Sequence, residues 1–450
     1  MKIILVNYRY FISGGPERYL FNIKGILEKR GHEVIPFSIK NERNTPNAYE
    51  SYFMSPVGKD NEVYFKDFKK FNLAIIAKFF LRMFYSFEAK RKLGALIRDT
   101  QPDLIYVLHY QNKISPSIFD AAKAHGIPVI NRISDFGSIC ANAHFYRPEQ
   151  ADICERCLTG SKFNAVRNKC VHHSFVYSAI KATSLKLQEV IHTTQKIQGF
   201  VVPSKFTIEK LKTHGFPPEK LHHIPTFFNF KTLSTNLEIR YDPFALYIGR
   251  IEPEKGLFTL IRSFVNTSFH LKVIGFSISG MEESLKKYLE GKNHHIEFLG
   301  KKSFEEIQHY LSRCLFTITP SECYDNLPNT LLESFAFRKC AVATDIGSLK
   351  ELVVDQKTGL LFGLKDVEAL RNKITYLFQN EEVARIWGQN AFDLLNLEFS
   401  AEKHYAHLIN LFNTAISQAK RITPEAPQEL PSSSGVIPDW ESRNQNPVEK

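Results

Sequence analysis

Over most of this 450-residue chain, short apolar runs rich in β-branched residues alternate with helix-length amphipathic segments. Parallel strands joined by crossover helices produce this alternation. The first unit consists of a buried run at 2–7, a glycine turn at 13–16 and an amphipathic helix at 17–30. The pattern predicts an α/β fold.

Two series of strands follow from the same pattern. The first series continues at 34–38, 104–108, 129–133 and 200–202. The second series lies at 244–248, 271–274, 296–299, 316–319, 341–344 and 359–362. A polar, weakly patterned segment at 230–242 separates the two. We therefore expect two parallel sheets in two domains, 1–230 and 231–399.

The end of the chain has a different composition. From residue 421 onward it holds five of the 21 prolines, a run of three serines and little apolar content. Such a segment cannot bury enough surface to offset the entropy lost on ordering. The composition predicts a disordered tail at 421–450.

Charge and composition narrow the class of protein. Lys and Arg number 58 against 47 Asp and Glu, for a net charge of +11, and 43% of the residues are hydrophobic. This balance indicates a folded, basic protein and excludes fibrous and disordered classes. No apolar run approaches the roughly 20 residues that span a bilayer. The apolar run at 3–6 is too short for a secretory signal, and seven cysteines are an odd number, which argues against a disulfide framework. We therefore expect a cytoplasmic chain with reduced thiols. We expect no nucleic-acid partner.

Residues 66–92 mix aromatic with basic side chains. One interpretation is an amphipathic helix that packs on the core and exposes its basic face. The other is a peripheral contact with an anionic membrane, such as the inner face of the cell membrane, through aromatic insertion and basic charge. The sequence leaves both open.

Gly14 and Gly15 stand between the first strand and its helix. A helix N-terminus presents free backbone N–H groups, and glycine lets an anion approach them closely. The pair therefore fits a phosphate site, although a tight turn explains it equally well.

Residues 247–257 lead from a strand, through a loop that contains proline, into a helix. The loop carries Arg250 and Lys255. Ligands of open α/β sheets bind at the carboxyl ends of the strands, so the two cations are placed to hold one polyanion. The alternative is a solvated surface pair.

Residues 320–336 (PSECYDNLPNTLLESFA) leave another strand and enter a helix at about 329. Asp325 belongs to the loop, and Glu333 lies one turn inside the helix. Both carboxylates are expected to face one crevice, and the backbone near Asn326 and Leu327 adds positive potential at the helix N-terminus. Two acids eight residues apart are also compatible with solvated side chains.

Together the Gly-Gly turn, the segment 249–256 (GRIEPEKG) and the segment 320–336 resemble the retaining GT-B glycosyltransferases of glycosyltransferase family 4. The resemblance covers about residues 1–420. It implies two Rossmann-like domains that face each other across a cleft, with the nucleotide-sugar on the second domain and the acceptor on the first. It also implies that a helix at 400–420 crosses back to the first domain.

The resemblance implies a role for each matching residue. Arg250 and Lys255 match the cations that hold the donor diphosphate, and Glu333 matches the acid that binds the ribose. The implied catalytic residues are Arg250, Lys255 and Asp325. The implied donor-binding residues are Gly14, Gly15, Gly249, Arg250, Lys255, Asp325, Asn326, Leu327 and Glu333.

Two positions depart from the family's pattern. Asp325 stands where the family usually has Glu, which shortens the carboxylate by one methylene. Ser134 stands before Asp135 where relatives commonly carry His, so the acceptor side lacks that imidazole. His109 and Asp135 are the candidate acceptor-side residues, although His109 is also compatible with an ordinary loop histidine.

Cys140, Cys154, Cys157 and Cys170 lie in an insert at 140–170 of the first domain. Four thiolates can close a tetrahedral structural zinc site. Only one C-x-x-C pair is present, and buried free thiols are the alternative.

The expected function is sugar transfer from a nucleotide-sugar to a glycan or lipid-linked acceptor with retention, in bacterial cell-surface polysaccharide synthesis. The chain has no D-x-D motif, so we expect no active-site metal and no cofactor beyond the donor. The alternatives are another GT-B sugar-nucleotide enzyme, such as an epimerase or phosphorylase, and a catalytically lapsed scaffold that docks on membrane. The sequence leaves the oligomeric state open.

Overall fold

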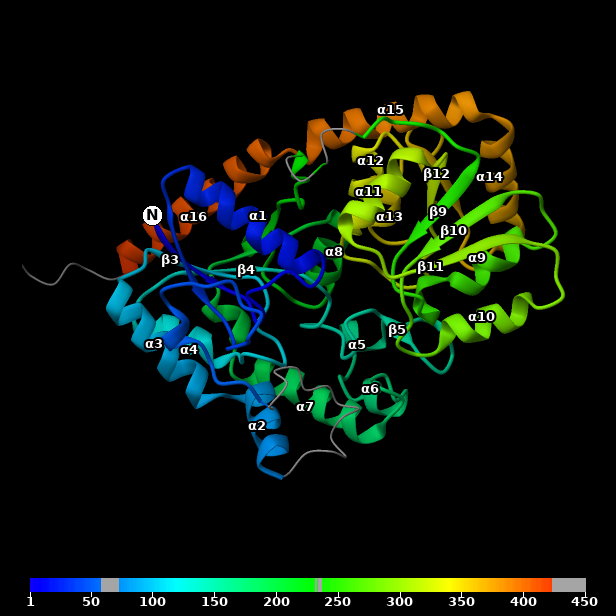
Figure 1. Cartoon of the computed structure of the whole chain (residues 1–450). Coiled ribbons are helices and arrows are strands. Elements are labelled where there is room, and N and C mark those ends of the chain that lie inside the picture. The colour runs from blue at the N-terminus through cyan, green and yellow to red at the C-terminus, as the bar shows by residue number, and fades with distance from the viewer. Residues whose placement is uncertain (58–72, 231–232, 234–236, 423–450) are drawn as a thin grey trace, which may run out of the picture.

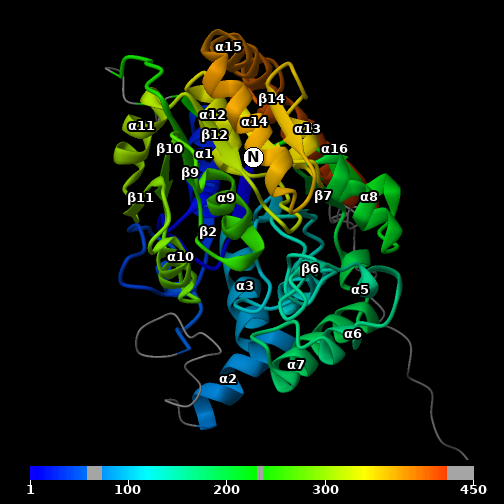
Figure 2. The same cartoon turned by 90° about the vertical axis from the view of Figure 1, so that its right-hand side faces the viewer.

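The computed structural model describes residues 1–57, 73–230, 233 and 237–422. It contains two six-stranded parallel sheets, each covered by helices on both faces (Figures 1 and 2). The order in the first sheet is β2 (Glu33–Phe37), β1 (Lys2–Val6), β3 (Leu104–Val107), β4 (Val129–Arg132), β7 (Gly199–Val202) and β8 (Leu221–His223). The order in the second sheet is β11 (His295–Gly300), β10 (His270–Ile274), β9 (Phe244–Ile248), β12 (Phe316–Thr319), β13 (Ala341–Thr344) and β14 (Gly359–Phe362). The predicted α/β class and its two sheets are confirmed.

Helices connect successive strands in both halves of the molecule. Those of the first half are α1 (Gly15–Lys29), α2 (Leu73–Phe84), α3 (Phe87–Thr100), α4 (Ser117–Ala124), α7 (Phe175–Val190) and α8 (Lys205–Thr213). Those of the second half are α9 (Leu257–Phe264), α10 (Met281–Leu289), α11 (Phe304–Arg313), α12 (Asn329–Ala336), α13 (Leu349–Leu352), α14 (Val367–Gln379), α15 (Glu381–Glu398) and α16 (Ala401–Ile422).

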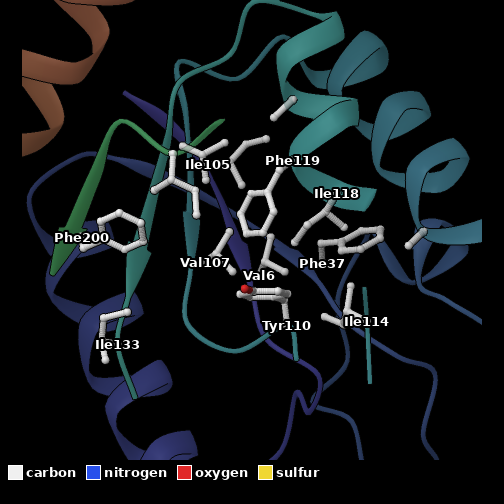
Figure 3. Close-up of a cluster of buried hydrophobic side chains, with 14 of the residues drawn as sticks. Val6, Phe37, Ile105, Val107, Tyr110, Ile114, Ile118, Phe119, Ile133 and Phe200 are labelled. Carbon is white, nitrogen blue, oxygen red and sulfur yellow. The ribbon is translucent and has the colours of Figure 1, made fainter. Parts of the chain in front are cut away.

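The strands are continuous apolar runs because helices bury both faces of each sheet. In the first sheet Ile4 pairs with Ile35 on one side and with Ile105 on the other, and all three are buried. Figure 3 shows the core on one face, where Phe119 of α4 and Phe200 of β7 lie among the strand side chains. Each such side chain contributes about 1.5–3 kcal/mol by its removal from water.

Two short pairings in the first half were not predicted. The strand β8 reads Leu-His-His, which has too little apolar character to indicate a strand. The insert after β4 forms a two-stranded antiparallel hairpin of β5 (Tyr146–Arg147) and β6 (Asp152–Ile153), followed by the one-turn helices α5 (Arg156–Thr159) and α6 (Asn164–Arg167).

The last helix returns from the second half of the molecule to the first (Figure 1). α15 covers the second sheet, and α16 then packs on the first sheet with Leu408, Leu411 and Phe412. The ring of Phe412 meets Tyr106 edge-on at 5.2 Å. α16 therefore ties the two halves together at the side opposite the insert.

The segment 66–92 lies only partly within the described residues. Residues 66–72 fall outside them, and α2 and α3 account for most of the rest. Phe79 and Met83 of α2 are buried, whereas Leu81 is 59% exposed. Among the described helices, none is both long and apolar enough to cross a membrane. The tail predicted at 421–450 lies outside the described residues from 423 onward.

Candidate active site

Each sheet has one point at which the strand order reverses, and the two points lie opposite each other. In the second sheet the reversal falls between β9 and β12, and in the first it falls between β1 and β3. Loops that follow neighbouring strands diverge at such a point and leave a crevice for ligands. The three predicted motifs all belong to loops at these positions.

Lys255 and Asp325 form a close ion pair across the second crevice. Lys255 follows β9, Asp325 follows β12, and the ammonium lies 2.5 Å from a carboxylate oxygen. Ser321 donates to the other carboxylate oxygen at 2.7 Å. Burial alone would lower the pKa of Lys255 and raise that of Asp325, but each charge stabilises the other, so the pKa of Lys255 is raised and that of Asp325 is lowered. Both groups are therefore charged at neutral pH.

Arg250 lies in the same loop as Lys255 and is more accessible. Its guanidinium contacts Glu254 at 2.9 Å and its side chain is 39% exposed. Tyr247 fixes the loop by donating from its hydroxyl to the Arg250 carbonyl at 2.7 Å. A Cβ at Gly249 would stand 2.7 Å from that same hydroxyl, so a larger residue there would displace the Tyr247 side chain.

The first domain approaches this crevice through the start of α1. A Cβ added at Gly15 would lie 2.5 Å from the side-chain amide nitrogen of Asn329 at the start of α12, whereas one at Gly14 would find its nearest neighbour at 3.8 Å. Gly15 therefore lets the first turns of α1 and α12 meet. The phosphate-compatible turn and the second-domain loops are in contact.

Glu333 was expected to face the crevice, but its side chain is buried. It is buried on α12, and Arg18 of α1 contacts it at 2.9 Å. Burial raises the pKa of Glu333, and the Arg18 charge only partly offsets this rise. The Arg18 guanidinium also lies over the Phe304 ring at 4.6 Å. Glu333 is thus engaged by the first domain, so a ligand that reaches it must displace Arg18.

Asn326 connects the two domains through its side chain. Its amide nitrogen donates to the Ile133 carbonyl at 2.8 Å, and its amide oxygen accepts from Thr207 at 2.7 Å. Leu327 packs partly buried beside the α12 core. The residue next to Asp325 is therefore fixed by the first domain.

A cavity of about 220 Å³ remains where these elements meet. Gly15 and Pro16 line it from α1, and Asp325, Asn326, Leu327 and Asn329 line it from the second domain. The loop after β4 contributes Ser134, Asp135 and His144. Gly15 of the first motif and Asp325 of the third thus border one space, and Lys255 of the second motif pairs with Asp325 at its wall.

His109 and Asp135 lie together on the first-domain wall, where both line one small cavity. The His109 ring packs 4.9 Å from the Tyr8 ring. Burial lowers the pKa of His109, and the Asp135 carboxylate opposes that shift. Ser134 accepts from Arg132 at 3.0 Å and donates to the Leu108 carbonyl at 2.9 Å, so its hydroxyl fixes the loop.

The zinc site proposed for the insert is not supported. All seven cysteines are free thiols. Within the described part of the chain, no group of three or more His, Cys, Asp or Glu side chains is arranged to hold a metal ion. Cys140 is buried and bonds Asn142 at 3.1 Å, which fits the alternative of packed free thiols.

Arg18 and His144 were missed by sequence reasoning. Arg18 lies in the first turn of α1, close to the glycine turn, and a cation at that place in the sequence could have been predicted to face the same site. His144 lies in the insert, whose cysteines were the only residues there that matched a known type of site. Its place in the cavity depends on how the insert folds back over the cleft.

Comparisons with known proteins agree with this arrangement. Residues 231–393 match the family model of glycosyl transferases group 1. An uncharacterised glycosyltransferase of Methanocaldococcus jannaschii is 34% identical over 177 residues, which cover 37% of this chain and 48% of that protein. The capsular polysaccharide biosynthesis glycosyltransferase CapM of Staphylococcus aureus is 24% identical over 205 residues, or 43% of this chain and 53% of CapM. The chain thus spans about half the length of these curated relatives.

Solved structures match over nearly the whole chain. Sucrose-phosphate synthase from Thermosynechococcus elongatus aligns with a TM-score of 0.67 and 16% identity over 93% of this chain and 99% of that one. Anabaena HepE, solved in complex with UDP, aligns with a TM-score of 0.59 and 14% identity over 92% of this chain and 100% of that one. At these identities the likeness shows the fold alone, and the fold is GT-B.

Proposed function

We propose that this protein is a glycosyltransferase that moves a sugar from a nucleotide-sugar donor to a hydroxyl group of a glycan or lipid-linked acceptor. The single observation that carries the proposal is the Lys255–Asp325 pair at the order reversal of the second sheet, with Arg250 near enough to Lys255 to act on its charge. Asp325 also lines the cavity that the start of α1 lines. The match of residues 231–393 to glycosyl transferases group 1 supports it. The likeness to CapM favours polysaccharide synthesis as the setting.

In this proposal the two cations bind the donor diphosphate. Arg250 offers a planar fork of donors on an exposed side chain, and Lys255 offers a point charge beside it. Asp325 then contacts hydroxyl groups of the sugar, and Glu333 contacts the ribose once Arg18 has moved. On the acceptor side, Asp135 lines this cavity and also the small neighbouring cavity that His109 lines.

The proposed reaction retains the configuration at the anomeric carbon. The bond from that carbon to the phosphate oxygen breaks, and the nucleoside diphosphate leaves with the electron pair. The acceptor oxygen bonds to the same face of the sugar, and its proton passes to the departing diphosphate. Arg250 and Lys255 stabilise the charge that develops on the leaving group, without a metal ion.

Substituting the two cations tests the proposal. We expect Arg250→Ala and Lys255→Ala each to lower the rate of sugar transfer about 10²–10³-fold, as removal of one preorganised charge-stabilising group does. The first step is to find the donor by thermal shift with UDP, GDP and ADP, followed by product analysis with the matching nucleotide-sugar. Lys302→Ala, at an exposed pair with Glu306, is the control.

Transfer at the wild-type rate in both variants would overturn the proposal. Lys255→Ala leaves the buried Asp325 carboxylate without its cation and can therefore unfold the protein. Arg250→Ala is expected to fold, because the Arg250 side chain is partly exposed, so a loss of its activity reports on the site. Conversion of the nucleotide-sugar to an epimer without any acceptor would assign the site to an epimerase instead.

A further inference from the structure

His144 faces the cavity between the two domains from the loop after β4. It lines that space opposite Asp325 and Asn326. Its side chain is half-buried, and within the described residues its ring makes no hydrogen bond to protein. The two ring nitrogens are therefore available to a ligand in the cavity.

The two residues that flank His144 have unusual backbone conformations. Its neighbours Ala143 and Phe145 have φ angles of 64° and 51°, in the left-handed region that residues with a Cβ rarely occupy. Each such residue costs about 1–3 kcal/mol and persists only where surrounding contacts enforce it. Backbone strain of this kind clusters at functional sites.

The contacts that enforce this conformation are specific. Phe145 is buried, with its ring 5.0 Å from Phe136 and 5.9 Å from Tyr324 of the second domain. Its carbonyl accepts from Cys154 at 2.7 Å. The His144 amide donates to the Asn142 side chain at 3.2 Å. The loop is thus fixed on both sides of His144 while the imidazole stays free.

The charges around His144 are those of the proposed donor site. Burial lowers the pKa of His144, the cations Arg250 and Lys255 lower it further, and Glu254 and Asp135 oppose the shift. In turn, His144 helps to lower the pKa of Asp325. The imidazole is therefore neutral near pH 7, with one N–H donor and one acceptor nitrogen.

We propose that His144 contacts the sugar–phosphate linkage of the donor, between the diphosphate held by Arg250 and Lys255 and the sugar held by Asp325. This inference rests on the proposed function. The N–H of the imidazole donates to a phosphate oxygen next to the bond that breaks. The insert therefore supplies a donor contact as well as a cover for the cleft.

The test compares a nucleoside with its diphosphate. The probe is the diphosphate among UDP, GDP and ADP that raises the melting temperature most, together with the matching nucleoside. By isothermal titration calorimetry we expect His144→Ala to weaken diphosphate binding roughly 10-fold or more, because a hydrogen bond to a charged group is lost, and to leave nucleoside binding unchanged. In turnover, kcat should fall more than the donor KM rises.

His144→Gln is expected to recover part of the affinity because its amide can still donate. His309→Ala, which removes an exposed histidine on α11, should behave as the wild type. If His144→Ala does not fold, the His144 imidazole resonance, assigned by its loss in His144→Gln, should shift with the diphosphate and not with the nucleoside.

Unchanged diphosphate affinity in His144→Ala, equal weakening of diphosphate and nucleoside, or an unmoved imidazole resonance would overturn the inference while the proposed function stands. Failure of the wild type to bind any of the three diphosphates would instead overturn the proposed function, and this inference with it.

Discussion

The Lys255–Asp325 ion pair contributes to the stability of the fold and also lies in the proposed donor site. Each side chain is 17% exposed, so the two charges have lost much of their water and depend on each other. The loss of one partner leaves the other charge buried and unpaired. If the proposed function holds, this contact serves both the stability of the fold and the binding of the donor.

We expect Asp325→Asn to lower the free energy of unfolding by about 3 kcal/mol, the cost of breaking a buried ion pair. Asp242→Asn is the matched control, because Asp242 and Arg313 form a close pair with side chains 28% and 40% exposed. Solvated pairs of this kind contribute about 1 kcal/mol or less. Urea unfolding followed by circular dichroism measures both, and equal losses would contradict the importance of burial.

The sequence could predict which side chains lie close together where a motif directly follows a strand. Arg250, Lys255 and Asp325 could be placed together because the carboxyl ends of neighbouring parallel strands meet at one edge. The Arg18–Glu333 contact could not be foreseen, since it depends on how far apart the two domains stand. His144 was hidden for a related reason: left-handed Ala143 and Phe145 leave no signature in the sequence.

At the scale of elements, α16 depends on one buried histidine. His404 is buried, and its ring bonds the Tyr19 hydroxyl of α1 at 2.9 Å and the Pro225 carbonyl at 2.7 Å. Burial lowers the pKa of His404 from 6.5 to about 3. The unfolded chain therefore binds one more proton than the folded protein between these values.

This difference predicts a pH dependence of stability. The contribution of His404 is complete above about pH 6.5 and is lost as the pH falls towards 3, by about 1.4 kcal/mol per pH unit. We expect His404→Gln to reduce the slope of unfolding free energy against pH by that amount between pH 6 and 4. Urea unfolding at several pH values measures it, with His309→Gln as an exposed control; parallel slopes in His404→Gln and the wild type would contradict the prediction.

Most strands could be predicted from sequence because two-sided burial demands continuous apolar runs. The bounds of β9, β12, β13 and β14 agree with the expected ranges. β8 was missed because the pairing with β7 outweighs the weak strand preference of Leu-His-His. The hairpin of the insert was missed because two-residue strands leave no periodicity.

At the scale of the whole molecule, the position of the two domains depends on polar contacts across the cleft. Arg18 pairs with Glu333, and Glu351 accepts from the backbone of Lys205 and Phe206 at the start of α8. Such contacts form only when the domains are close. They favour the closed arrangement, together with the ring contacts of Tyr324 with Phe145 and Phe206.

We expect Arg18→Ala to open the molecule at pH 8. Without Arg18 the buried Glu333 carboxylate lacks a partner, and separation of the domains restores its water. Small-angle X-ray scattering should show a larger radius of gyration than for the wild type, and Glu333→Gln in the same background should reverse the change. Arg30→Ala removes the cation that directly follows α1, paired with Glu402, and is the control. Identical scattering from Arg18→Ala and the wild type would contradict the prediction.

The side-chain amide of Asn326 links the position of the two domains to the proposed active site. Because Asn326 bonds Ile133 and Thr207 of the opposite domain, separation of the domains would break the two bonds that hold the residue next to Asp325. Under the proposed function, an activated sugar bound to separated domains would meet an incompletely assembled pocket, where its transfer to water would be slow. Economy of donor use would then depend on the contact between the two domains rather than on any reacting group.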